Sequence, residues 1–204
     1  MRFALGAALA AAVGVWCCAE VGAAIITQVN PSTSLADSTW SATDEPSDVK
    51  IDLVTNFKDP AMLGSPLMLK FTLEANDVGK PIWLVHGAGG TEGQNNTGPA
   101  WNGFDMLLVN VSSVLPQYAG AGFDTTKTIT SDKFSSVSVV ADRIEFTGGT
   151  VANGTAVHFS NIWITHSGEA GDVFYLKQIP VPEPATLAVI ALGGLGVLAR
   201  RNRR

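Results

Sequence analysis

The stretch PLMLKFTLEAN, residues 66–76, carries a leucine or phenylalanine at every second position from Leu67 to Leu73. Lys70, Thr72 and Glu74 occupy three of the positions between and beyond them. Successive side chains of a β-strand point to opposite faces. The period of two therefore predicts a strand with one face in a core and the other in water.

Six further stretches show a similar pattern, and no part of the body carries the apolar stripe of an amphipathic helix. Clusters of Gly, Asn, Asp and Pro separate these stretches, as turns separate short strands. The sequence therefore predicts an all-β fold, a single antiparallel β-sandwich with a jelly-roll or an Ig-like topology. The six stretches are residues 48–57, 80–87, 104–114, 134–149, 155–166 and 172–179.

The pattern in residues 155–166 also predicts which side chains face the core. Val157, Phe159 and Trp163 share one face if the stretch is one regular strand. The residues expected on the opposite face are His158, Ser160, Ile162 and Ile164.

Two polar stretches of the body do not show the strand pattern. Residues 31–48 predict a loop or an edge strand, and residues 86–103 predict the longest loop of the body. Long loops are frequent sites of function.

Acidic residues outnumber basic ones between the two ends of the chain. Five of the 13 basic and two of the 18 acidic residues lie outside residues 25–180, which leaves 8 basic and 16 acidic residues there and a formal net charge of −8. Such a surface repels phosphate backbones, so the sequence argues against a nucleic-acid partner.

The N-terminal residues 1–24, MRFALGAALAAAVGVWCCAEVGAA, have one arginine, an apolar run and then small residues. This is the pattern of a secretory signal peptide, and small residues precede a signal-peptidase cut after Ala24. Both cysteines of the chain, Cys17 and Cys18, lie in this segment. The mature chain is therefore expected to have no disulfide, no thiolate metal site and no cysteine nucleophile.

The C-terminal residues 181–204, VPEPATLAVIALGGLGVLARRNRR, combine three features in a fixed order. Pro182-Glu183-Pro184 comes first, residues 185–199 carry no charge, and arginines dominate the last five positions. A helix over the uncharged part would be about 22 Å long, which is short for a bilayer core of about 30 Å and suits a temporary membrane anchor. Basic residues stay on the cytoplasmic side, so the body is expected on the far side.

This order of motif, apolar segment and arginine cluster resembles the PEP-CTERM sorting signal, and the resemblance covers about the last two dozen residues. It implies recognition of Pro182, Glu183 and Pro184 by an exosortase, a membrane protease that cuts near this motif. It also implies a Gram-negative host that makes exopolysaccharide, transient anchoring in the inner membrane, and a secreted or cell-surface product. The chain thus divides into residues 1–24 (signal peptide), 25–180 (β-sandwich) and 181–204 (sorting signal).

A carbohydrate-binding module is one alternative for the body. Trp101 stands in a polar, glycine-rich stretch, and an exposed tryptophan there would stack on a sugar ring. Asn96, Asn102 and Asp105 are the candidate partners for sugar hydroxyls.

A secreted esterase-like hydrolase is the less favoured alternative. The stretch WLVHGAGG, residues 83–90, resembles the oxyanion-hole strand of esterases and lipases. The chain lacks the Gly-x-Ser-x-Gly nucleophile motif of that fold, and Ser167 beside His166 does not by itself make a triad. We therefore expect His86 to begin a glycine-rich turn and the protein to have no catalytic activity.

The sequence also predicts no metal site and no cofactor. The three histidines, His86, His158 and His166, form no H-x-H or HExxH pair. An acidic loop at residues 43–48 lacks the order of a calcium-binding loop. The function expected from the sequence is that of a non-catalytic cell-surface or extracellular-matrix protein associated with exopolysaccharide or biofilm.

Overall fold

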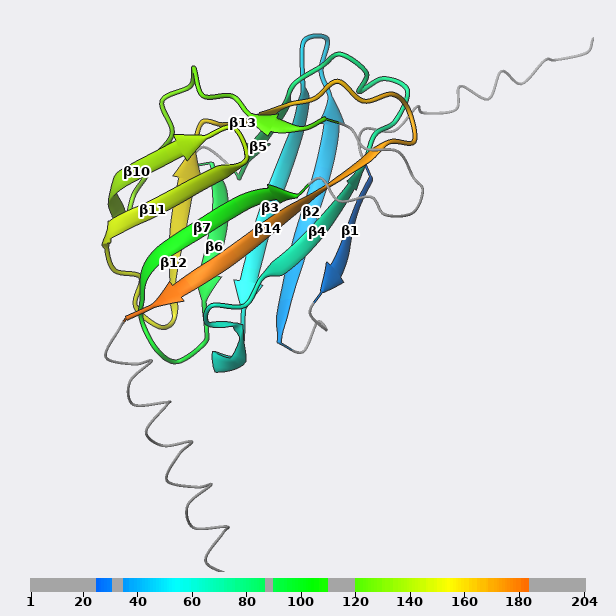
Figure 1. The fold of residues 1–204 in the computed structure, drawn as a ribbon. Helices are drawn as coiled ribbons and strands as arrows, with labels where there is room; N and C mark the ends of the chain where they lie inside the picture. The colour runs from blue at the N-terminus through cyan, green and yellow to red at the C-terminus, as the bar shows by residue number, and fades with distance from the viewer. Residues whose placement is uncertain (1–24, 31–34, 87–89, 110–119, 184–204) are drawn as a thin grey trace, which may run out of the picture.

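The computed structural model describes residues 25–30, 35–86, 90–109 and 120–183. These residues form fourteen β-strands and one 3₁₀ turn, η1 (Pro60–Met62). The strands lie in two sheets (Figure 1). The all-β fold predicted from the period-two stretches is therefore confirmed.

The first sheet has six strands, all paired antiparallel. It forms the front layer in Figure 1, with the orange C-terminal strand near its middle. In spatial order its strands are β1 (Ile25–Asn30), β4 (Leu67–Thr72), β14 (Val173–Pro182), β7 (Trp101–Val109), β11 (Arg143–Gly149) and β10 (Phe134–Val140).

The second sheet has eight strands and lies behind the first in Figure 1. Strand β3 (Val49–Phe57) pairs with β2 (Ala36–Asp44) along one side and with β5 (Ile82–Val85) and β6 (Thr91–Asn95) along the other. The other strands follow in the order β8 (Gly122–Phe123), β13 (Ile162–Thr165), β5, β3, β6, β12 (Thr155–Ser160) and β9 (Thr130–Ser131).

This second sheet is mixed, so the expectation of a purely antiparallel fold is wrong. The first half of β3 pairs parallel with β5, and its second half pairs parallel with β6. Strands β13 and β12 then pair antiparallel with β5 and β6. Strands β5 and β6 thus follow one another along β3, and β13 and β12 follow one another beside them. Residues 86–90 separate β5 from β6, and Asn161 separates β12 from β13.

Asn161 changes which side chains face the core. It has a positive φ of 62°, a left-handed conformation that Asn tolerates better than most residues. Val157 and Phe159 before it are buried, and so are Ile162 and Ile164 after it. The prediction that Trp163 shares a face with Phe159 is wrong, because the irregular residue shifts the alternation by one position.

The core lies between the two sheets and is rich in aromatic rings. Phe57 of the eight-stranded sheet and Phe104 of the six-stranded sheet pack edge-on, with ring centroids 5.8 Å apart. Phe104 also contacts Phe159 at a centroid distance of 4.8 Å. One buried cluster of apolar residues joins both sheets, as expected for two sheets packed face to face.

Strand β6 lies inside the stretch that was predicted to be the longest loop. Its inward side chains include Thr91 and Asn95, which are polar and fully buried. The Thr91 hydroxyl donates to the Leu53 carbonyl at 2.8 Å, and the Asn95 amide donates to the Val151 carbonyl at 2.8 Å. Both buried polar side chains thus have hydrogen-bond partners on the backbone. Because these inward residues are polar, the sequence of this buried strand resembles that of a loop. The other polar stretch, residues 31–48, contains the edge strand β2, in agreement with the prediction.

The predicted signal peptide, residues 1–24, and the predicted apolar anchor, residues 185–199, lie outside the described residues. Within residues 25–30, 35–86, 90–109 and 120–183, no helix is long and apolar enough to cross a membrane. The first described residue, Ile25, already belongs to strand β1.

Candidate functional site

Trp101 belongs to the core and is not available to a sugar. Its side chain has no exposed surface, and its ring centroid lies 5.3 Å from that of Phe57. Its indole N–H donates to the Thr97 hydroxyl at 3.2 Å. The prediction of a glycan contact at Trp101 is therefore wrong, because strand β7 turns this residue into the space between the sheets.

The polar partners proposed with Trp101 do not form one surface. Asn102 and Asp105 lie on β7 of the six-stranded sheet, whereas Asn96 follows β6 of the eight-stranded sheet. Asp105 accepts a hydrogen bond from the Arg143 guanidinium at 2.9 Å. Burial raises the pKa of Asp105, and the charge of Arg143 opposes that shift. Asp105 thus belongs to an ion pair rather than to a sugar site.

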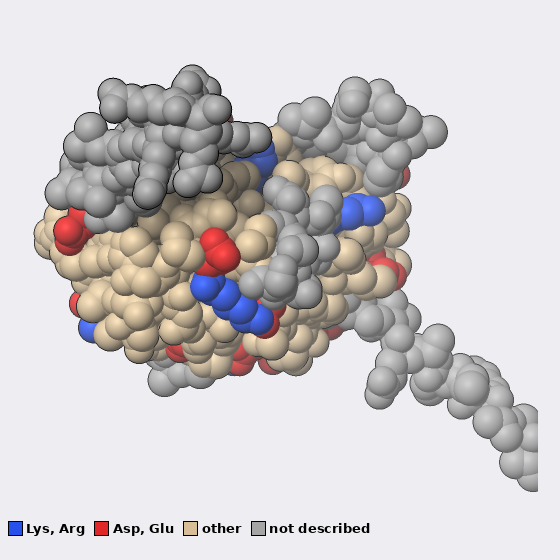
Figure 2. Space-filling model, turned by 90° about the horizontal axis from the view of Figure 1, so that it is seen from below, with Lys and Arg blue, Asp and Glu red and all other residues tan. Residues whose placement is uncertain are grey.

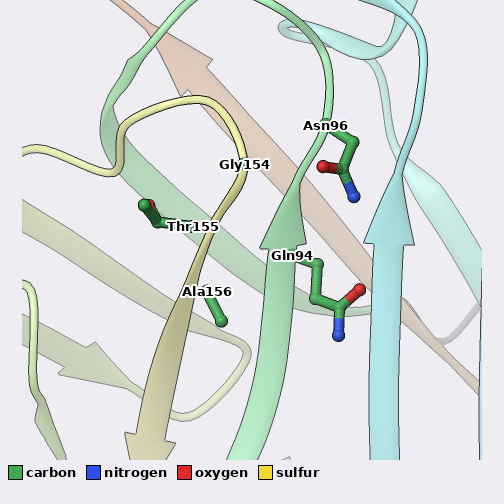
Figure 3. Close-up of a pocket in the computed structure, with 5 residues that line it drawn as sticks. All are labelled: Gln94, Asn96, Gly154, Thr155 and Ala156. Carbon is green, nitrogen blue, oxygen red and sulfur yellow. The ribbon is translucent and has the colours of Figure 1, made fainter.

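Asn96 instead lines a polar pocket at one end of the eight-stranded sheet (Figure 3). The cavity measures about 300 Å³. Asn96 and Gln94 point from β6 and its end towards β3, while the opposite wall comes from β12 and the turn before it. The residues that line the pocket are Gln94, Asn96, Gly154, Thr155 and Ala156.

Hydrogen bonds hold the two amide side chains of this pocket. The Asn96 amide donates to Asn56 Oδ1 at 2.8 Å, and the Gln94 amide donates to Glu92 Oε1 at 2.7 Å. The Asn153 side chain accepts from the Gly98 N–H at 2.8 Å and ties together the two turns at the pocket's end. Amides and hydroxyls both donate and accept hydrogen bonds, so they suit a ligand rich in hydroxyl groups.

A row of histidines and carboxylates crosses the outer face of the same sheet. His86 lies directly after β5, Glu92 on β6 and His158 on β12. Asp52 of β3 and Asp132, which follows β9, stand at the two ends of the row. His86 and His158, isolated in the sequence, are thus brought to one carboxylate, Glu92.

The sequence does not predict this row, because its members are far apart in the chain. The alternation of β3 and β12 does place Asp52 and His158 on the wet face. Only the pairing of β12 with β6 brings His158 directly opposite Glu92. A single sequence does not reveal which strands are neighbours, so the cluster becomes visible only in the folded sheet.

The esterase-like arrangement does not assemble among the described residues. The Nδ1 atom of His86 lies 2.7 Å from Asp52 Oδ1. No hydrogen bond in the described part of the chain joins Ser167 to His86. Residues 87–89, the glycine-rich turn that would form an oxyanion hole, lie outside the described residues.

Two tryptophans stack on the outer face of the eight-stranded sheet. Trp83 of β5 and Trp163 of β13 are cross-strand partners, with ring centroids 5.2 Å apart and planes at 2°. Lys50 lies 5.7 Å from the Trp83 ring centroid, and Lys127 lies 4.9 Å from that of Trp163. The two ammonium groups make cation–π contacts with the rings. The ring faces of this stack are therefore covered by lysines of the protein itself.

Charged side chains of both signs lie on the face of the described residues that Figure 2 presents. The acidic loop considered for calcium is partly neutralised, because the Lys80 ammonium contacts Asp44 and donates to the Glu45 carbonyl at 2.8 Å. Within the described ranges, no group of three or more His, Cys, Asp or Glu side chains is arranged so that it could hold a metal ion.

The sorting motif begins inside the folded body. Strand β14 extends to Pro182, the first residue of Pro182-Glu183-Pro184, and Pro182 pairs with Trp101 of β7. Pro182 is buried, and the described structure ends one residue later, at Glu183. The body predicted to end at residue 180 thus continues to the motif itself.

Comparison with known proteins identifies this C-terminal segment. A family model described as the PEP-CTERM protein-sorting motif matches residues 180–204. Neither curated proteins nor solved structures give a match to the chain. The chain therefore ends in a PEP-CTERM protein-sorting motif, which implies sorting by an exosortase to the cell surface or the exterior.

Proposed function

We propose that this protein is a cell-surface or extracellular-matrix component of a Gram-negative bacterium, delivered by an exosortase and acting by binding rather than catalysis. The observation that carries the proposal is the PEP-CTERM motif at residues 180–204, which overlaps the end of strand β14. In this proposal the two face-to-face sheets form a β-sandwich that serves as a rigid binding module. Signal peptidase removes residues 1–24, the apolar segment anchors the chain transiently in the inner membrane, and the exosortase then releases or transfers the body.

Delivery is tested by following the protein through cell fractions. The wild-type chain is expected in the surface or extracellular fraction, and Glu183→Ala is expected to leave it in the membrane fraction. Glu169→Ala is a matched control, because Glu169 is an exposed acid of the body outside the motif. An equal distribution of wild type and Glu183→Ala would overturn the proposed delivery.

The polar pocket supports carbohydrate binding as a second candidate function. Its lining includes the amide side chains of Gln94 and Asn96, beside a cavity of about 300 Å³. These groups match the hydroxyls of a neutral glycan, and exopolysaccharide is the glycan expected where the sorting motif delivers the protein. The candidate sugar contacts are therefore Asn96 and Gln94 in place of Trp101.

Titration calorimetry with purified exopolysaccharide fragments tests the second candidate. Asn96→Ala and Gln94→Ala are expected to weaken binding at least about tenfold, since each removes hydrogen bonds to the ligand. Asn102→Ala is the matched control, because Asn102 lies on the other sheet. Binding that is unchanged by both pocket substitutions would exclude this site.

A further inference from the structure

Strand β10 is a free edge of the six-stranded sheet. Along one side it pairs with β11, and it pairs with no other strand of the described residues. Figure 1 shows it at the outer margin of the front layer. In an antiparallel ladder, alternate residues direct their backbone N–H and C=O groups away from the paired strand. Every second residue of β10 therefore presents a hydrogen-bond donor and an acceptor along this margin, where a further strand can pair.

The other strand edges of the two sheets carry features that keep sheets from joining. Strand β1 has a register shift near its end, which bends the edge. Strand β2 carries Asp37 and Asp44, which form ion pairs with Lys58 and Lys80. Strands β8 and β9 have only two residues each. Charges, bulges and short lengths are the usual protections of a free edge.

Strand β10 has none of these protections. Its seven residues, FSSVSVV, contain no charge and no proline, and a strand of this length extends over about 23 Å. Its pairing with β11 continues without a register shift. Ser136 and Ser138 are exposed, and Val140 keeps 52% of its surface accessible. A long, uncharged and exposed edge of this kind is normally avoided in a protein that stays monomeric.

The residue pattern of β10 suits antiparallel pairing with an identical strand. Serine and valine alternate from Ser136 to Val139. Val137 and Val139 are partly buried against the rim of the core, whereas the serines between them are exposed. A two-fold axis at Ser138 would place Val137 of one copy opposite Val139 of the other. No like charges meet in this arrangement, and each inward valine gains a β-branched neighbour, which is a favourable cross-strand pair.

We propose that two copies of this protein associate through β10, whose antiparallel pairing about a two-fold axis joins the two six-stranded sheets into one. Because both copies use the same edge, the contact closes at a dimer. One pair of strands buries less surface than the roughly 1,200–2,000 Å² of a standard interface, so the dimer is weak and depends on concentration. This association requires only the folded body and is independent of the proposed delivery and sugar binding.

Sedimentation equilibrium of the purified mature protein over a range of concentrations tests the proposal, and a reversible monomer–dimer equilibrium is expected. Ser138→Glu should raise the dissociation constant at least about fivefold, because it brings two carboxylates together at the axis. Thr147→Glu is the matched control. Both substitutions add a carboxylate beside Glu145, which lies opposite Ser138 and two residues before Thr147. Only Ser138 lies on the free edge, so Thr147→Glu should dimerise like the wild type.

Hydrogen exchange locates the surface at which the copies meet. Backbone amides of β10 should gain protection as the protein concentration rises, with no comparable gain in β1 or β2. Circular dichroism of both variants establishes that the fold is retained. Wild-type protein that stays monomeric overturns the proposal, and so does growth beyond the dimer, which would indicate head-to-tail pairing of different edges. Equal dissociation constants for folded Ser138→Glu and Thr147→Glu would also overturn it.

Discussion

The indole ring of Trp101 packs edge-on against the ring of Phe57, with centroids 5.3 Å apart and planes at 87°. Trp101 belongs to the six-stranded sheet and Phe57 to the eight-stranded sheet. This contact therefore joins the two layers of the fold, close to the point where Pro182 ends strand β14 beside Trp101.

Trp101→Ala is expected to reduce the free energy of unfolding by about 3–5 kcal/mol, the usual cost of removing a large buried aromatic side chain. Chemical denaturation followed by circular dichroism measures the loss. Trp40→Ala is the control, because Trp40 is 40% exposed on the edge strand β2 and its removal should cost less than about 1 kcal/mol. A loss at Trp101 no larger than at Trp40 would contradict the buried position.

The alternating stretches predict most strands but not their neighbours. Residues 66–76 and 172–179 show clear alternation, and both form strands of the six-stranded sheet. Strand β6 escapes detection because Thr91 and Asn95 replace the apolar residues that normally mark an inward face. The parallel pairing of β6 with β3 is not predicted either, since it depends on contacts between segments distant in the sequence.

The functional surface is harder to predict than the fold for a related reason. Trp101 has the sequence setting of an exposed sugar contact, yet the alternation of β7 buries it. His86 and His158 have no metal-binding spacing in the sequence, yet both lie close to Glu92 in the folded sheet. His158 is on the strand next to that of Glu92, and His86 lies between β5 and β6. Only the sorting motif is local, and it is the functional feature that the sequence predicts correctly.

Asn161 permits the shift in alternation between β12 and β13, and this gives a test at a single residue. Asn161→Val is expected to destabilise the fold by about 1–3 kcal/mol, because a β-branched residue is strained at a φ of 62°. Asn161→Gly should be nearly neutral, since glycine adopts this conformation readily. Thermal unfolding of the two variants measures the difference, and equal stability of the Val and Gly variants would contradict the left-handed conformation.

Gly90 lies where the interrupted strand before β6 crosses close to β12. A Cβ atom at this position would clash with the Phe159 carbonyl oxygen, and the φ of 94° is also unfavourable for other residues. Gly90→Ala should therefore cost more than the roughly 1–2 kcal/mol of the left-handed conformation alone. Gly154→Ala is the matched control, with a φ of 76° and no atom within 4 Å of its added Cβ. Denaturant titration that finds both substitutions equally costly would exclude the close approach.

The partly buried position of His166 predicts that the free energy of unfolding falls in mild acid. Burial lowers the pKa of His166, and a hydrogen bond with the Lys80 backbone opposes the shift. The unfolded chain, with an ordinary histidine pKa of about 6.5, then binds a proton more readily than the folded chain. The free energy of unfolding therefore falls as the pH drops through the unfolded pKa, until the pH is below the folded pKa and both states are protonated.

The pH effect of His166 is isolated by comparing wild type with His166→Gln across pH 7.5 to 5. Other titrating groups are shared by both proteins, so their contributions largely cancel in the difference. Wild type should lose stability relative to the variant as the pH falls. A constant difference over this range would show that His166 titrates alike in the folded and unfolded chains.

The overlap of strand β14 with the sorting motif limits where the exosortase can cut. Residues 180–182 are paired with β7, and β14 lies between β4 and β7 in the six-stranded sheet. A cut before Pro180 would remove part of a central strand and uncover Trp101. We therefore expect intact-mass analysis of the secreted protein to show a chain that starts at Ile25, keeps Pro182 and lacks the C-terminal arginines.

A mature species that retains Arg200–Arg204 would contradict processing at the motif. A species that ends before Pro180 would instead contradict the role of β14 as a complete strand of the mature fold.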